Sequence, residues 1–175
     1  FFALLATFSF AQVLTPVHWN WTAESVSANE YKLIFTAQID KGWHTYGMYI
    51  QDGGPVKTSF TFDKNSNVEL IGKMTEAGPK VHEGIDDVFG VSVKSFEEKA
   101  VFEQRIKVKN NTSLKGSLEF MVCDDKSCLP PDQKKFSFDL TAKTVDVKKN
   151  SSDTLSSKTE PVETVYSSSD STPVE

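Results

Sequence analysis

Apolar residues alternate with polar ones along several short segments of the chain, and this period of two most strongly constrains the fold. In YKLIFTAQI, residues 31–39, every second side chain from Tyr31 onward is apolar. Because successive side chains of a β-strand point to opposite faces, the pattern places one face of each strand in a core. The same alternation occurs at 100–108, 117–122 and 135–140, and two shorter strands are predicted at 58–62 and 67–72.

Turn-forming residues separate these segments, and no segment has the 3.6-residue apolar period of an amphipathic helix. Gly, Asp and Asn gather in runs such as DKGW, DGGP and KNNTSLKG. About seven short alternating strands within roughly 130 residues are typical of a sandwich of two sheets. The predicted fold class is therefore all-β, an antiparallel immunoglobulin-like β-sandwich.

The first eleven residues, FFALLATFSFA, form an apolar run that ends in a small-x-small pattern, Ser9-Phe10-Ala11. We interpret residues 1–11 as the remnant of a secretory signal peptide cleaved after Ala11, the alternative being a buried first strand. The run is too short to cross a bilayer, and no other stretch approaches the ~18 apolar residues needed. We therefore expect an exported domain without membrane insertion, in a compartment where disulfides persist.

The last 32 residues differ in composition from the rest of the chain. Ser and Thr account for 13 of the residues in 144–175, and apolar periodicity is almost absent. We interpret this segment as a disordered tail or linker and residues 12–143 as the folded domain. A linker at this place is compatible with a longer natural protein that continues into a membrane domain.

Composition and spacing argue against two classes of ligand. The net charge is −5 and Lys and Arg form no dense cluster, so nucleic acid is not an expected partner. No cofactor is predicted. A metal site could use the two cysteines with a histidine, but His18, His44 and His82 are scattered and lack zinc-finger spacing. A copper- or zinc-binding module stays the third alternative.

The only two cysteines, Cys123 and Cys128, lie in MVCDDKSCLPPDQ with four residues between them. They could form a redox couple or a structural bridge. If the preceding strand continues to Cys123, its side chain points away from the apolar face. A disulfide closing so small a ring adds only about 2 kcal/mol to stability, which makes it a weak but accessible bridge. Asp124 and Asp125 disfavour a nearby thiolate, so we expect a relay couple rather than a strongly activated nucleophile.

Three motifs, in order, resemble the N-terminal periplasmic domain of the thiol:disulfide interchange protein DsbD family. They are KGWHTYG followed by GGPVKTSF, then HEGIDDVFG, then CDDKSCLPP before a Phe-rich strand, and they cover most of residues 42–140. The resemblance implies an immunoglobulin-like domain in the periplasm that takes electrons from a thioredoxin-like donor. It also implies acceptors outside the cytoplasm, such as disulfide isomerases and cytochrome c maturation proteins, and a protein-disulfide reductase activity within a relay.

The resemblance also assigns residues. Cys128 would form the mixed disulfide with partners and Cys123 would resolve it. The segment DDVFG matches a cap loop that lies over the disulfide, which assigns Asp86, Asp87, Val88 and Phe89 to the site. Better-known members have aromatic residues at both positions before the glycine, whereas this chain has Val88 and Phe89.

Two residues of the first motif, His44 and Tyr46, are included as surroundings of the site, with a packing role as the alternative. A histidine can carry protons near a thiol, but the sequence alone does not place His44 there. The predicted function is thiol-disulfide relay through Cys123 and Cys128. The alternative is a non-catalytic β-sandwich interaction module whose disulfide is structural.

Overall fold

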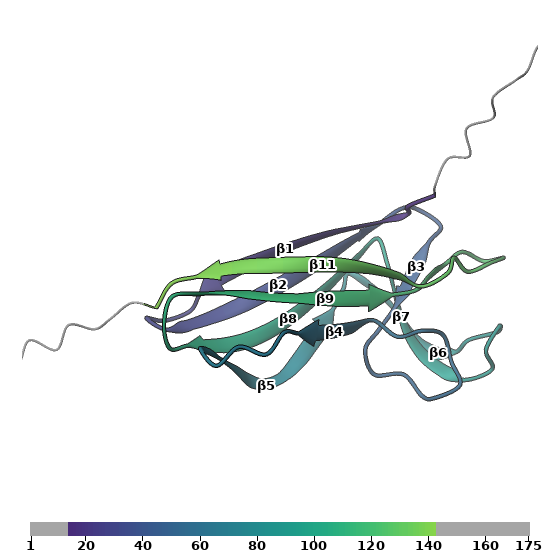
Figure 1. Cartoon of the computed structure of the whole chain (residues 1–175). Helices are drawn as coiled ribbons and strands as arrows, with labels where there is room; N and C mark the ends of the chain where they lie inside the picture. Colours follow the sequence, from purple (N-terminus) through teal and green to yellow (C-terminus); the bar gives the residue numbers. More distant parts are fainter. Residues whose placement is uncertain (1–13, 143–175) are drawn as a thin grey trace, which may run out of the picture. The chain divides into compact units, whose positions relative to one another are not determined.

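The computed structural model describes residues 14–142, and these residues form strands and loops without a helix (Figure 1). The predicted signal-peptide remnant at 1–11 and the predicted tail or linker at 144–175 lie outside them. The strands are β1 (Val17–Ser25), β2 (Glu30–Ile39), β3 (His44–Tyr46), β4 (Ser59–Phe62), β5 (Val68–Ala77), β6 (Lys80–Ile85), β7 (Ser92–Glu97), β8 (Lys99–Val108), β9 (Thr112–Phe120), β10 (Val122–Cys123) and β11 (Asp132–Leu140).

The strands form three antiparallel sheets, with orders β1-β2-β8-β5, β11-β9-β4 and β10-β3-β7-β6. Five of the six predicted segments lie in one strand each, to within a residue, whereas 117–122 spans the end of β9 and the start of β10, with Met121 between them. The alternating residues of β2 confirm the predicted face, because Leu33, Phe35 and Ala37 are fully buried. Residues 14–142 form eleven strands rather than about seven. β3, β6, β7 and β10 show too little alternation to be recognised, whereas β1 alternates Val17, Trp19 and Trp21 with polar residues and was missed although its pattern is visible.

The core lies between the first two sheets and is built largely from aromatic rings. The ring of Phe35 on β2 lies 4.7 Å from that of Phe60 on β4 and 4.8 Å from that of Phe136 on β11. Gly116 on β9 permits this packing, because a Cβ there would collide with the Phe136 ring and the Thr61 carbonyl. The predicted immunoglobulin-like sandwich is confirmed.

The third sheet extends one end of the sandwich, and it carries the cysteines. Figure 1 shows β6 and β7 at the same end as the loop between β9 and β11. After Phe120 the chain leaves the β11-β9-β4 sheet, and the next strand, β10, pairs with β3 instead. The Thr45 hydroxyl, on β3, donates to the Met121 carbonyl at this crossing (2.9 Å). The main sandwich thus positions a small sheet on which the cysteine pair lies.

Candidate functional site

The two cysteines close a short hairpin. Cys123 and Cys128 form a disulfide, and their backbones pair as an antiparallel bridge. The Leu129 amide donates to the Val122 carbonyl (2.9 Å) and the Asp124 amide donates to the Ser127 carbonyl (2.9 Å), so backbone hydrogen bonds flank the disulfide on both sides. The hairpin is therefore held by its own backbone as well as by the sulfur–sulfur bond.

The carboxylate of Asp124 stabilises the tip of this hairpin. Its Oδ1 accepts hydrogen bonds from the amides of Lys126 (2.8 Å) and Ser127 (2.7 Å). These two backbone hydrogen bonds lower the pKa of Asp124. The Asp124 carboxylate thus accepts hydrogen bonds from the amides of its own turn, a structural role that Asp residues often have in tight loops.

The two sulfurs differ in exposure. Cys123 is 2% exposed and packs with Tyr46 and Val93 in a small cluster separate from the main core. The predicted orientation away from the main core is therefore correct, but the side chain is buried under the third sheet rather than accessible. Cys128 packs against the same cluster and is only half-buried. Cys128 is therefore the more exposed residue of the pair.

Tyr46 lies against the buried sulfur and is itself 1% exposed. Its hydroxyl lies 3.4 Å from Cys123 Sγ and 3.1 Å from Asp86 Oδ2, and it can donate to either. Burial raises the pKa of Tyr46, and the charge and hydrogen bond of Asp86 add to that shift. The phenol therefore stays protonated and can donate a hydrogen bond to Cys123 Sγ.

His44 makes the third contact of this hydroxyl. Its Nε2 shares a hydrogen bond with Tyr46 Oη (3.1 Å), and the two rings meet edge to face. Burial lowers the pKa of His44, while Asp86 and Glu97 partly oppose the shift. His44 is thus a half-buried, predominantly neutral imidazole at neutral pH.

The predicted cap loop is a closed turn between β6 and β7. Asp86 Oδ1 accepts from the amides of Val88 (2.9 Å) and Phe89 (3.1 Å), and the Gly90 amide donates to the Asp86 carbonyl (2.8 Å). Val88 is 78% exposed, whereas Phe89 is half-buried with its ring 6.5 Å from that of Tyr46. Phe89 is therefore the cap-loop side chain that packs against Tyr46, and Val88 lies at the exposed rim of the site.

One open pocket of about 590 Å³ brings these groups together. It is lined by all eight residues that the sequence pointed to, namely His44, Tyr46, Asp86, Asp87, Val88, Phe89, Cys123 and Cys128. Its wall also includes Glu97 on β7 and Asp125, Lys126 and Ser127 of the cysteine hairpin. Glu97 could not be found from the sequence, because β7 shows no clear alternation. Within residues 14–142 no three potential metal ligands cluster.

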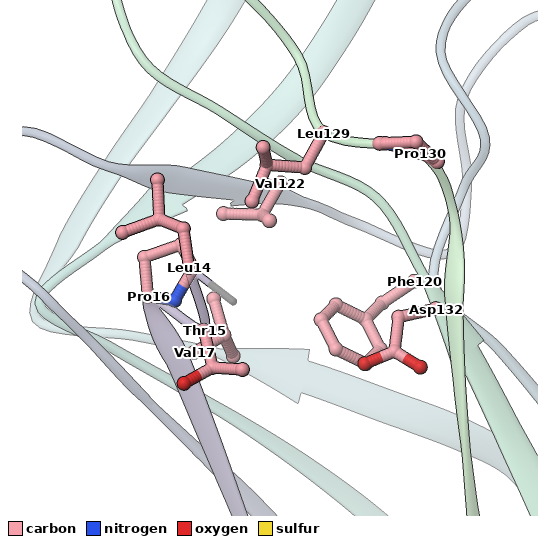
Figure 2. A pocket seen from close by; sticks show the side chains of 9 residues that line it. All are labelled: Leu14, Thr15, Pro16, Val17, Phe120, Val122, Leu129, Pro130 and Asp132. Atoms are coloured by element: carbon pink, nitrogen blue, oxygen red, sulfur yellow. The ribbon is translucent and has the colours of Figure 1, made fainter. Parts of the chain in front are cut away.

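A second pocket lies beside the cysteine hairpin and is mainly apolar (Figure 2). Leu14, Pro16 and Val17 form one side, and Phe120, Val122 and Leu129 face them. Neither sulfur lines it. It belongs to the packing of the segment that leads into β1.

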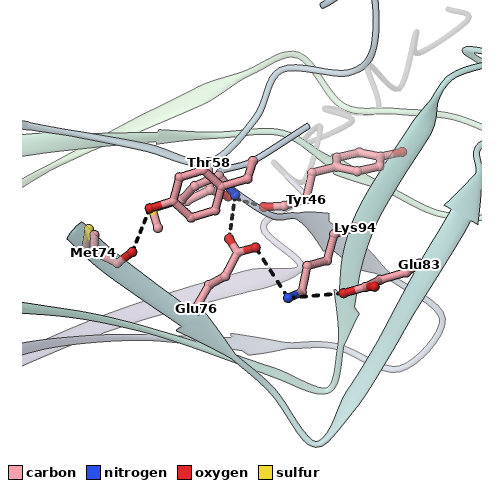
Figure 3. Close-up of polar contacts among 8 residues, drawn as sticks. Tyr46, Thr58, Met74, Glu76, Glu83 and Lys94 are labelled. Carbon is pink, nitrogen blue, oxygen red and sulfur yellow. Dashed lines mark hydrogen bonds and ion pairs between the residues drawn. The ribbon is translucent and has the colours of Figure 1, made fainter. Parts of the chain in front are cut away.

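A buried carboxylate fixes the chain just after Tyr46 (Figure 3). The Glu76 side chain, from β5, is 5% exposed, accepts from the Met48 amide (2.6 Å) and pairs with Lys94 Nζ on β7 (3.6 Å). Its oxygens lie so close to Gly47 that a Cβ there would approach Oε1 to 2.9 Å. The Thr58 hydroxyl donates to the Tyr46 carbonyl (2.5 Å). Together these contacts hold the Tyr46 backbone in register.

Fold and site together define an immunoglobulin-like domain with a cysteine pair at one end. Cys123 is buried, and Cys128 is half-buried. The chain belongs to the family of the N-terminal domain of the thiol:disulfide interchange protein DsbD, whose model matches residues 11–140. The name of this family describes thiol:disulfide interchange. No curated protein sequence is significantly similar to the chain.

Two of the solved structures that share the fold are the following. The N-terminal periplasmic domain of ScsB from Proteus mirabilis is 19% identical with a TM-score of 0.53, and the match covers 73% of this chain and 49% of that one. The chain therefore spans about half the length of that relative. The reduced DsbD N-terminal domain from Neisseria meningitidis is 17% identical with a TM-score of 0.50, covering 74% and 91%. Residues 14–142 contain no helix suited to spanning a membrane.

Proposed function

We propose that the domain relays reducing equivalents by thiol-disulfide exchange through Cys123 and Cys128. The observation that carries this proposal is the unequal exposure of the two sulfurs. Cys128 is half-buried at the pocket, whereas Cys123 is buried and lies against the Tyr46 hydroxyl. One sulfur is thus open to a partner, and the other is held close enough to displace that partner.

The exchange proceeds in two displacements. In the reduced domain the Cys128 thiolate attacks one sulfur of an acceptor disulfide, forms a mixed disulfide and releases the acceptor's other sulfur as a thiolate. Cys123 then attacks Cys128 Sγ, which re-forms the Cys123–Cys128 bond and releases the acceptor reduced by two electrons. Recharging is the reverse, with a donor thiolate attacking Cys128 and Cys123 leaving as a thiolate beside the Tyr46 hydroxyl.

The proposed donor is a thioredoxin-like domain, and the proposed acceptors are proteins outside the cytoplasm. The proposed compartment is the periplasm, where the related ScsB domain is described as lying. The signal-like run at residues 1–11 supports the same compartment. In this arrangement the domain is one step of a protein-disulfide reductase relay within a longer protein.

The phenyl ring of Phe89 is proposed to shield the couple in the absence of a partner. The ring reaches the pocket from a loop held by the Asp86 carboxylate, and it packs edge-on against Tyr46. A loop ring in this position slows access by small oxidants, yet a docking protein can displace it without unfolding the sheet. Asp87 lies at the exposed rim of the same loop.

The test uses single-cysteine variants and a thioredoxin-like protein that carries one exposed cysteine, activated as a mixed disulfide with thionitrobenzoate. The Cys123→Ser variant should form a one-to-one covalent adduct that dithiothreitol dissolves, because Cys128 reacts and nothing resolves the product. The Cys128→Ser variant should form the adduct far more slowly, because Cys123 is buried. Non-reducing gel electrophoresis over a time course measures both rates.

The double variant, Cys123→Ser with Cys128→Ser, is the control for non-covalent association. Equal, slow adduct formation by both single variants would overturn the relay. It would leave the alternative in its place, a β-sandwich interaction module in which the disulfide is only a structural bridge.

A further inference from the structure

Strand β3 lies between β10 and β7, and its first residue faces the buried sulfur. His44 is directly opposite Cys123 on β10 and directly opposite Glu97 on β7. Residues directly opposite one another in antiparallel strands project from the same face of the sheet. The backbone register therefore places the imidazole, the sulfur and a carboxylate on one face.

Two hydrogen-bond contacts join the buried sulfur to the partly exposed imidazole. Cys123 Sγ lies 3.4 Å from Tyr46 Oη, and Tyr46 Oη lies 3.1 Å from His44 Nε2. Cys123 and Tyr46 are almost fully buried, whereas His44 is half-buried and borders the pocket. A proton that leaves Cys123 has a continuous path through the phenol hydroxyl to the imidazole.

We propose that His44 accepts the proton of Cys123, through the Tyr46 hydroxyl, when Cys123 resolves a mixed disulfide on Cys128. This inference rests on the proposed exchange function. The Cys123 thiol proton passes to Tyr46 Oη while the Tyr46 proton passes to His44 Nε2. Cys123 Sγ bonds to Cys128 Sγ, and the bond from Cys128 to the partner breaks. The partner leaves as a thiolate, and His44 returns its proton to solvent.

The charges around His44 suit this task. Asp86 from the cap loop, Glu97 from β7, and Asp124 and Asp125 from the cysteine hairpin all act on the ring and favour the imidazolium once it forms. The basic side chains of Lys126 and His82 also line the pocket. Burial lowers the pKa of His44 and so favours the neutral ring, which has one nitrogen without a proton. The proposed step requires that nitrogen to be Nε2, the one that meets Tyr46 Oη. An imidazole is also closer in pKa to a thiol than a carboxylate is, which favours His44 over Asp86 as the base.

The experiment follows the two-phase reaction of the reduced chain with Ellman's reagent. Attack by Cys128 releases the first thionitrobenzoate, and resolution by Cys123 releases the second, so absorbance separates the two steps. We expect His44→Gln, which keeps a hydrogen-bonding side chain but cannot take up a proton, to slow the second phase about tenfold or more near pH 7. The difference should vanish above about pH 8.5, where the thiol ionises unaided.

Three further variants separate proton transfer from packing. Tyr46→Phe should slow the second phase like His44→Gln, and the double variant should be no slower than either single one, because both break the same path. His18→Gln on β1, where His18 faces Asp40, is the matched control and should leave both phases unchanged. Melting curves establish that each variant is folded.

The outcomes are distinct for the two proposals. A wild-type protein without a second phase would overturn the exchange function itself. A normal second phase whose rate and pH profile are unchanged in His44→Gln would overturn the role of His44 alone. Loss of the second phase in Asp86→Asn, with His44→Gln unchanged, would assign the proton to Asp86 and also overturn the inference.

Discussion

At the scale of single residues, the cap loop contains two adjacent apolar side chains with opposite environments. Val88 projects into solvent, whereas Phe89 faces the pocket and contacts Tyr46. The turn made by the Asp86 carboxylate sets this difference, since it fixes the direction of both following residues. The pair therefore offers a test with its control built into the same loop.

We predict that Phe89→Ala lets dithiothreitol reduce the Cys123–Cys128 disulfide several-fold faster, because removing the ring opens the pocket to small reagents. Val88→Ala should change the rate far less, because Val88 is 78% exposed at the rim of the pocket and covers little of it. Stopped-flow measurement of the reduction rate for both variants provides the comparison. Equal rates for the wild type and both variants would show that Phe89 does not shield the couple.

A second residue-scale prediction concerns pH and His44. Burial lowers the pKa of folded His44 below the ~6.5 of the unfolded chain, so the unfolded chain binds more protons between these values. The free energy of unfolding must then fall as pH falls through about 6.5. Wild type should therefore lose more stability than His44→Gln between about pH 7.5 and about 5.5, measured by urea denaturation. Parallel curves for the two proteins would contradict a lowered pKa.

At the scale of elements, the cysteine hairpin has two sources of order. The disulfide closes a ring of few residues, and β10 also pairs with β3 while backbone hydrogen bonds close the turn. Ring closure of this size contributes about 2 kcal/mol in the chain-entropy model. The backbone pairing does not depend on the sulfurs.

We therefore predict that Cys123→Ser with Cys128→Ser stays folded and loses no more than about 2 kcal/mol of unfolding free energy. Chemical denaturation of the oxidised wild type and the double variant provides the measurement. An unfolded double variant would mean that the disulfide is a structural requirement, which would favour the alternative function.

The elements also show which parts of the fold could be predicted. Strands β2, β8, β9 and β11 follow from alternation, because each has one face in the main core. β3 and β10 are too short for a period to be visible, and β6 is mostly exposed, so it has no apolar face. The site depends on those less visible strands. Its residues could be named from motif resemblance, but the contact from His44 through Tyr46 to Cys123 comes from register, which no short motif reveals.

At the scale of the whole molecule, the main sandwich contains the large core, and the small third sheet carries the cysteine hairpin. The family match ends at residue 140, where β11 also ends. The proposed boundary of the folded domain, near residue 143, is therefore close to the end of the last strand.

Deleting residues 144–175 should leave the melting temperature nearly unchanged, because a segment so rich in Ser and Thr can bury little apolar surface. Thermal melts of the full and shortened chains, followed by circular dichroism, test the boundary. A drop of many degrees would place part of this segment within the folded domain.

The unequal exposure of the two sulfurs also imposes an order of events. For a relay that works through Cys128, electron donor and electron acceptor must occupy the same pocket, and one must depart before the other arrives. Donor in excess then becomes a competitive inhibitor of delivery, even though it is the source of the electrons. The rate of electron transfer would then be limited by how quickly each partner dissociates. Tight binding of either the donor or the acceptor would slow the relay.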